Sequence, residues 1–160
     1  MIAKLSKFLT LALATGFGIG LYAPFAPGTF GSLPGLVLVF LMSYLSVPLQ
    51  IGFCVLLALF AVFVCGKAEK YLGIKDDGRI AADEWMLLPI AFIAIPLFEL
   101  PLYKIILMFG VVRLIDILKP WPCKSLQSIK GGLGIVIDDF VANIYSLVVN
   151  IFIWKTTLLG

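Results

Sequence analysis

Apolar runs separated by short loops dominate this sequence and leave too few charges to cover a water-facing surface. Hydrophobic residues make up 62% of the chain and charged residues 13%, whereas a soluble domain carries ~25% charged residues. In lipid, each segment must satisfy its own backbone hydrogen bonds, which a helix does. The composition therefore predicts an all-α, polytopic membrane helical bundle and argues against an unusually apolar soluble protein.

The length fits one membrane-embedded domain over residues 1–160, with about five or six apolar helices. These segments are expected at residues 8–21, 36–48, 51–66, 85–98, 102–118 and 134–158. The first contains the glycine-rich sequence GFGIG, so we expect it to dip into the membrane and return rather than span it. The N-terminus lacks a convincing cleavage site and is interpreted as part of the fold, not as a signal peptide.

Twelve of the 21 charged residues lie in loops at residues 67–84 and 119–132, and the loop at 23–35 is uncharged. An even number of predicted crossings separates these loops, which places all of them on one side of the membrane. Their basic residues are Lys67, Lys70, Lys75, Arg79, Lys119, Lys124 and Lys130. The positive-inside rule makes that side cytoplasmic. These bases suit anionic lipid headgroups, and their interleaving with acids argues against a nucleic-acid partner.

Acidic side chains are expected to converge at this face. They are Asp83, Glu84, Asp116, Asp138 and Asp139. Asp138 and Asp139 are adjacent within the apolar sequence GIVIDDFVA, where two carboxylates repel each other and lose their hydration. A divalent cation is the economical way to neutralise them. The chain has no histidine to suggest zinc, and oxygen ligands suit Mg²⁺, with Mn²⁺ as a substitute.

Basic and small residues near these acids indicate a phosphate site. Arg113 and Lys119 lie three positions on either side of Asp116, so a helix projects all three from roughly one face. Beside a bound cation they form a clamp for phosphate, although alone they fit a salt-bridged helix end equally well. The loop sequence PGTFGS adds small side chains and hydroxyls that let an anion approach the backbone. These residues are Gly28, Thr29, Gly31 and Ser32.

Residue patterns that mark several known phosphatase mechanisms are absent from the sequence. The absence of histidine excludes phosphohistidine and histidine-nucleophile mechanisms. None of Cys54, Cys65 and Cys123 has an arginine six positions later, so the cysteine phosphatase loop is absent, and these residues are interpreted as core cysteines or free thiols. No two aspartates stand two positions apart, so the aspartyl-phosphate signature is absent as well. Hydrolysis by a metal-activated water remains.

Four motifs occur in the order APGTFGS, DE at Asp83–Glu84, RLIDILKPWP and GGLGIVIDDFVA. With these motifs the chain resembles the phosphatidylglycerophosphatase A family over most of its length. The resemblance implies a Mg²⁺-dependent enzyme of the bacterial inner membrane, with its active site on the cytoplasmic side. It also implies a lipid substrate: the terminal phosphate is removed from phosphatidylglycerophosphate, giving phosphatidylglycerol and inorganic phosphate.

The resemblance assigns roles to the matching positions. Metal binding and water activation fall to Asp83, Glu84, Asp138 and Asp139. Phosphate and metal contacts fall to Arg113, Asp116 and Lys119, and Thr29 and Ser32 are expected near the phosphate.

Other membrane functions fit the sequence less well. A CDP-alcohol phosphotransferase also sets aspartates in membrane helices, but its spaced signature is not met by DDGRIAADE. A small transporter with an acidic polar path would distribute acids across the membrane depth, whereas the predicted spans are apolar in the middle. A purely structural subunit gives no reason to cluster the charges.

Overall fold

Two long helices form the frame of the protein. The computed structural model describes residues 2–19 and 27–156, and in this part it contains helices, turns and loops but no strand. Helices α5 (Val47–Leu72) and α9 (Gly132–Lys155) are each long and apolar enough to cross a membrane, judged by length and composition. At ~1.5 Å per residue each exceeds the ~30 Å of a hydrocarbon core. The all-α class is confirmed, and the number of spans stays a prediction.

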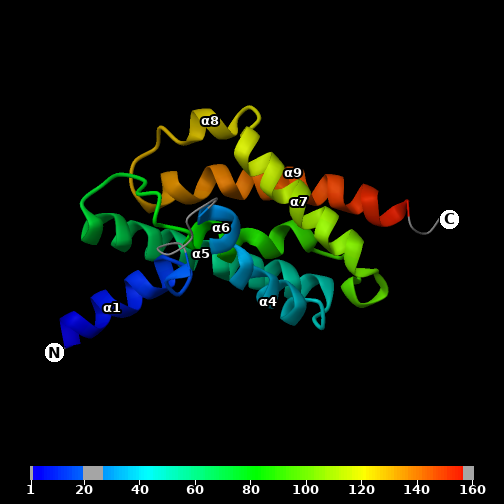
Figure 1. The fold of residues 1–160 in the computed structure, drawn as a ribbon, viewed down its shortest axis with the longest axis horizontal. Helices are drawn as coiled ribbons and strands as arrows, with labels where there is room; N and C mark the ends of the chain where they lie inside the picture. Colours follow the sequence, from blue (N-terminus) through cyan, green and yellow to red (C-terminus); the bar gives the residue numbers. More distant parts are fainter. Residues whose placement is uncertain (1, 20–26, 157–160) are drawn as a thin grey trace.

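Eight shorter elements complete the described part of the chain. They are α1 (Ile2–Ala14), α3 (Pro27–Gly31), α4 (Leu33–Met42), α6 (Ala82–Leu87), α7 (Leu102–Leu118), α8 (Cys123–Leu126) and the 3₁₀ turns η1 (Leu88–Phe92) and η2 (Leu97–Glu99). Helix α9 contacts α5, α6, α7, α8 and η1, and α4 packs on α6 and η1. Figure 1 shows α9 running along the longest axis, with α7 beside it and α8 near its N-terminal half.

The ends of the long helices follow from local sequence. Helix α5 has Pro48 in its first turn, where the missing N–H has no helical partner to lose. It ends at Gly73, whose φ of 72° only glycine adopts easily and whose N–H donates to Glu69 O at 2.9 Å. Helix α9 starts against α5, because a Cβ at Gly132 would lie 2.0 Å from Val62 O. Gly132 thus brings the start of α9 onto the α5 backbone, where it faces Gly66.

The apolar run at residues 85–98 is not the spanning helix that its hydropathy predicts. Helix α6 gives way to η1 at Leu88, the residue before Pro89, and a second break follows at Pro96. Proline removes a backbone donor and disfavours helix in the residue before it. The expectation of a continuous segment here is therefore wrong. This stretch of the chain is a broken, buried segment.

Side chains from both long helices form hydrogen bonds with backbone groups of the broken segment. Gln50 Oε1 on α5 accepts the Ala94 N–H at 2.8 Å, and Asn150 Nδ2 on α9 donates to Ala91 O at 3.0 Å. Both side chains are buried. Irregular backbone is tolerated in an apolar surrounding only where protein groups complete its hydrogen bonds, and these two amides do so here.

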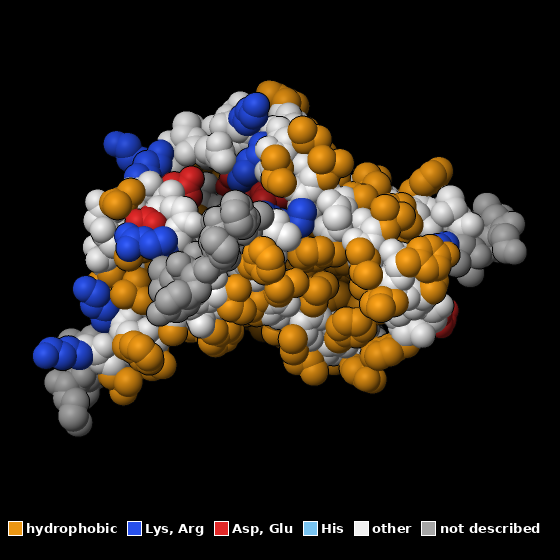
Figure 2. Space-filling model, viewed as in Figure 1, with side chains coloured by type: hydrophobic (Ala, Val, Ile, Leu, Met, Phe, Trp, Pro, Cys, Tyr) orange, Lys and Arg blue, Asp and Glu red, His pale blue; other side chains and the backbone are white. Residues whose placement is uncertain are grey.

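Charge and apolar surface are separated. On the face shown in Figure 2, most Lys, Arg, Asp and Glu side chains gather toward one end, and hydrophobic side chains cover much of the remainder. Large apolar residues are highly exposed on α5, α7 and α9, including Leu56, Leu102 and Phe152. Soluble monomers rarely expose such extended apolar patches. The surface is therefore suited to contact with lipid at its apolar part.

The predicted re-entrant segment at residues 8–21 is only partly described. Helix α1 ends at Ala14, and a turn follows in which Gly16, Phe17 and Gly18 all have positive φ. Residues 20 and 21 lie outside the described residues. The return of the chain therefore stays a prediction.

Candidate active site

Three helices bring the predicted carboxyl groups together at the polar end. Asp83 and Glu84 lie in the first turn of α6, Asp116 lies near the end of α7, and Asp138 and Asp139 lie near the start of α9. The four aspartates are buried. Asp83 interacts electrostatically with Glu84, Asp116 and Asp138, and also with Asp139. The convergence expected from the sequence is present.

Lys119 lies at the centre of this cluster. It is the C-cap of α7, with a left-handed φ of 42° and an N–H that donates to Ile115 O at 2.9 Å. Its Nζ donates to Asp139 Oδ1 at 2.8 Å and to Asp138 Oδ2, and lies 3.5 Å from Asp116 Oδ1. Burial lowers the pKa of Lys119, but the carboxylates outweigh it and hold the pKa above its ordinary value. Lys119 is therefore protonated beside the α9 acids.

Arg113 links the acids of α6 and α7. Its Nη1 lies 3.0 Å from Asp116 Oδ2 and 3.2 Å from Glu84 Oε2, and its side chain is largely buried. The predicted row of Arg113, Asp116 and Lys119 on one face of a helix end is present. Its two cations are shared with carboxylates of α6 and α9, so this is more than a local salt-bridged helix end.

The loop sequence PGTFGS, most of which forms α3, approaches the cluster through Gly28. A Cβ at Gly28 would lie 2.3 Å from Glu84 Oε1 and 2.8 Å from Arg113 Nη2, so a larger residue would displace the ion pair. Ser32 Oγ donates to Thr29 O at 2.9 Å and is thus engaged within its own loop.

The remaining glycine of this loop has a packing contact. A Cβ at Gly31 would lie 2.6 Å from the Ala81 side chain, just before α6. Gly31 therefore lets α3 approach the segment that carries Asp83 and Glu84. The phosphate contacts predicted for Thr29 and Ser32 stay predictions.

Gln127 is a site residue that sequence reasoning missed. Its Nε2 donates to Asp138 Oδ2 at 3.0 Å, from the C-cap position of the short helix α8. It lies in a polar loop, where a glutamine carries no distinguishing signal. Only the approach of α8 to α9 brings it beside Asp138.

Partnerless oxygens make the cluster receptive to a cation. Asp83 Oδ1 and Asp138 Oδ1 are buried and accept no hydrogen bond from the residues that the structure describes. Glu84 Oε2 and Asp116 Oδ1 also lack one, although each lies within ion-pair distance of a basic side chain. Buried carboxylate oxygens without partners are costly. The donor set is all oxygen, which fits Mg²⁺ chemistry.

In this structure the carboxylates of α7 and α9 are held around the ammonium of Lys119. Among the residues described, no three His, Cys, Asp or Glu side chains form a ready-made metal-binding group. Mg²⁺ would therefore require the carboxylates to draw closer than they lie around the Lys119 ammonium.

Burial and mutual repulsion perturb the acids of α6. Burial raises the pKa of Glu84 to about 7; Arg113 opposes this shift and Asp116 adds to it. The pKa of Asp83 is raised well above its ordinary value, first by burial and then by Glu84 and Asp116. The carboxyl groups outnumber the two cations, so full ionisation leaves excess negative charge. Protonation or a bound cation must offset it.

Comparison with known proteins identifies the family. The chain matches the family model of phosphatidylglycerophosphatase A over residues 12–154. It is 41% identical over 139 residues to phosphatidylglycerophosphatase A of Haemophilus influenzae, covering 86% of this chain and 83% of that protein. It is 35% identical over 154 residues to phosphatidylglycerophosphatase A of Escherichia coli, covering 92% of this chain and 85% of the relative. No solved structure gives a significant match. The resemblance expected from the four motifs is thus confirmed, and the chain belongs to the phosphatidylglycerophosphatase A family.

Proposed function

We propose that the chain is an integral phosphatase of the bacterial inner membrane that hydrolyses phosphatidylglycerophosphate to phosphatidylglycerol and phosphate, with Mg²⁺ as cofactor. The observation that carries the proposal is the buried acid cluster with Lys119 and Arg113 at the polar end of an apolar, all-helical member of this family. Such a site offers cations for a phosphate and carboxylates for a metal ion and a water.

The two cations are the candidates for holding the substrate phosphate. Arg113 offers a planar guanidinium that matches two phosphate oxygens at once, and Lys119 offers an ammonium. Both are now paired with carboxylates. Phosphate binding would therefore exchange carboxylate partners for phosphoryl oxygens. Gly28 lies directly against Arg113 and Glu84, where any side chain would displace their ion pair.

The carboxylates are the candidates for metal binding and proton transfer. Mg²⁺, or Mn²⁺ in its place, would be held by oxygens drawn from Asp83, Glu84, Asp116, Asp138 and Asp139. When bound, the ion would neutralise phosphoryl oxygens and lower the pKa of a coordinated water. Hydrolysis adds water to phosphorus and breaks the bond to the glycerol oxygen. A carboxylate accepts the proton of the water, and the departing glycerol oxygen takes up a proton.

The proposed orientation has the site on the cytoplasmic side. It rests on the two long apolar helices and on the basic residues near the acidic cluster. Positive residues favour the cytoplasmic side, where lipid headgroups with a terminal phosphate are accessible.

A phosphate-release assay tests the proposal. Purified protein in detergent micelles is given phosphatidylglycerophosphate and a panel of other lipid phosphomonoesters, with Mg²⁺ or with chelator. We expect release from phosphatidylglycerophosphate that stops with chelator and returns with Mg²⁺. A folded protein that releases no phosphate from this lipid in Mg²⁺ would contradict the proposal.

A further inference from the structure

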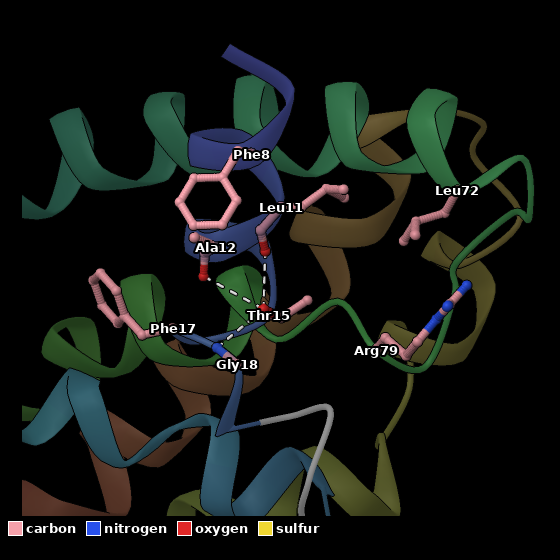
Figure 3. A pocket seen from close by; sticks show the side chains of 8 residues that line it. All are labelled: Phe8, Leu11, Ala12, Thr15, Phe17, Gly18, Leu72 and Arg79. Atoms are coloured by element: carbon pink, nitrogen blue, oxygen red, sulfur yellow. Dashed lines mark hydrogen bonds between the residues drawn. The ribbon is translucent and has the colours of Figure 1, made fainter. Parts of the chain in front are cut away.

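A pocket of about 430 Å³ lies between α1 with its following turn and the C-terminal end of α5, with Arg79 in its lining. This volume falls within the ~300–1,000 Å³ typical of ligand pockets. Its apolar walls include Phe8, Leu11, Ala12, Phe17 and Leu72. Figure 3 shows Leu11 and Thr15 on one side of the pocket, with Leu72 and Arg79 across from them.

The polar side chains of the pocket define what it can bind. Thr15 Oγ1 donates to Leu11 O at 2.9 Å and accepts the Gly18 N–H at 3.1 Å, so its hydroxyl is already engaged. Arg79 is about half exposed and is held by Asp77, through Nε at 2.8 Å and Nη2 at 2.6 Å. Asp77 offsets its charge, and among the described residues no acceptor engages the Nη1 hydrogens. The pocket therefore suits a molecule with an apolar body and a hydrogen-bond acceptor at one end.

The pocket is joined to the segment that carries the catalytic candidates. The Ala81 N–H donates to Ala14 O at 2.7 Å, and Trp85 Nε1 donates to Leu13 O at 3.1 Å. The Phe17 ring lies 5.7 Å from the Trp85 ring. Helix α1 thus forms a wall of the pocket and is also bonded to both flanks of the DE pair in α6. The pocket is therefore joined, through α1 and Phe17, to the segment that carries Asp83 and Glu84.

We propose that this pocket receives an acyl chain of the anionic glycerophospholipid substrate, with Arg79 donating to the phosphodiester of the headgroup. The inference rests on the proposed function and extends it to the part of the lipid that does not react. A wholly polar solute would find no partners along the walls. An acyl chain needs none, and burying its methylene groups is favourable.

A second pocket on another side of α1 supplies a matched control. It has a volume of about 310 Å³ and is lined in part by Leu9, Phe60 and Phe63. The lysine of this pocket, Lys67, lies over the Phe63 ring at 4.3 Å. Leu13 of this second pocket accepts the Trp85 hydrogen bond, but the ring contact with Trp85 is made by Phe17 of the first pocket, so we assign the second pocket no role in substrate binding. A bulky residue at Leu9 adds volume to the same helix without entering the proposed acyl pocket.

Binding can be tested without catalysis. Phosphatidylglycerophosphate with a photoreactive group on its acyl chain is crosslinked to the full chain in micelles, and labelled residues are mapped by mass spectrometry. We expect labelling at Leu11, Ala12 and Leu72, competed by unlabelled long-chain lipid. Ala12→Trp and Leu72→Trp, made separately, should each reduce it, whereas Leu9→Trp should not. Labelling scattered over the apolar helices, as for adventitious lipid only, would overturn the inference, and so would equal loss in Leu9→Trp.

Kinetics separate this inference from the proposed function. Filling the pocket by Ala12→Trp should raise KM for long-chain substrate by about tenfold, the scale on which a hydrophobic pocket senses a methylene or two. The KM for deacylated substrate should not change. Arg79→Gln should raise KM for both substrates, whereas Lys70→Gln at the same end should change neither. Equal KM changes for both substrates in Ala12→Trp would contradict the acyl pocket. Specific labelling without phosphate release by wild-type protein would contradict the function alone.

Discussion

The Nζ atom of Lys119 lies 2.8 Å from Asp139 Oδ1, although the two residues are 20 positions apart and belong to different helices. The contact depends on the left-handed backbone of Lys119 at the end of α7. It fastens the α7 terminus to the buried start of α9, where Asp138 accepts from the same ammonium. One lysine therefore holds together the carboxylates that we propose bind the metal ion. A variant that lacks this ammonium tests whether the cluster needs it for stability.

Replacing either acid of α9 should remove activity and leave the fold intact. Asp138→Asn and Asp139→Asn keep the side-chain shape but lose a charged oxygen, so we expect phosphate release to fall by about 100-fold or more. Thermal stability in micelles should be retained, because one charge leaves a crowded cluster. Lys75→Ala is the control, since its exposed Nζ donates to the backbone Gln127 O at 3.4 Å. If all variants lost activity alike, the site assignment would be wrong.

Removing Lys119 should destabilise the protein most at neutral pH. Lys119→Met leaves the buried carboxylates of α7 and α9 without their shared cation, which is expected to cost about 3 kcal/mol. Protonation at lower pH should recover part of this loss. Mg²⁺ should raise the melting temperature of Lys119→Met more than that of the wild type. Lys70→Met, at an exposed position, should change little. An unchanged melting temperature in Lys119→Met would show that the cluster does not need its ammonium.

Stability in chelator should fall as pH rises through the titration of Glu84. Its pKa is about 7 in the folded protein and 4.5 ordinarily, so the folded state holds the proton more tightly. Its contribution is present below the ordinary pKa and is lost by about pH 7, to a limit of ~3 kcal/mol. Melting temperatures between about pH 5 and 8 measure it. Glu84→Gln should flatten the profile; a wild-type melting temperature that rose across this range would contradict the assignment.

The acid cluster could be predicted because charge is scarce in an apolar chain. Adjacent carboxylates in a long apolar helix, Asp138 and Asp139, have few reasons to exist other than a site. The three-residue spacing of Arg113, Asp116 and Lys119 also predicts that a helix presents all three side chains on one face. Sequence reasoning therefore recovered residues whose chemistry conflicts with their surroundings.

Features that depend on tertiary packing could not be predicted in the same way. Lys119 lies at the centre of the cluster because its backbone is left-handed at the end of α7. The local sequence does not indicate that a lysine adopts this conformation. The contact of Gln127 with Asp138 depends on how a loop folds back. In the run at 85–98, Pro89 and Pro96 were signals of a break. Hydropathy alone cannot distinguish a spanning helix from a buried irregular segment.

Gln127 should act as a positioning residue for Asp138. Its hydrogen bond engages Asp138 Oδ2, while Oδ1 has no hydrogen-bond partner in the described part of the chain. Gln127→Leu is expected to lower kcat by about tenfold with little change in KM, because the carboxylate is no longer oriented while the phosphate clamp remains. Gln127→Asn should retain part of the activity. Ser128→Ala is the neighbouring control, since this hydroxyl bonds only to Ser125 O. A larger effect on KM than on kcat would indicate a role in substrate binding instead.

The amides that satisfy the broken segment should be required for stability. Gln50→Leu leaves the Ala94 N–H without its acceptor, and Asn150→Leu leaves Ala91 O without its donor, each at a cost of about 1–3 kcal/mol. We expect lower melting temperatures in micelles for each variant, and a larger drop when both are combined. Activity should fall as well, because this segment continues directly from α6 and its acids. Ser43→Ala, which removes an exposed local hydrogen bond, should leave both measurements unchanged. A stabilising effect of Asn150→Leu would mean that apolar packing, not backbone satisfaction, holds the segment in place.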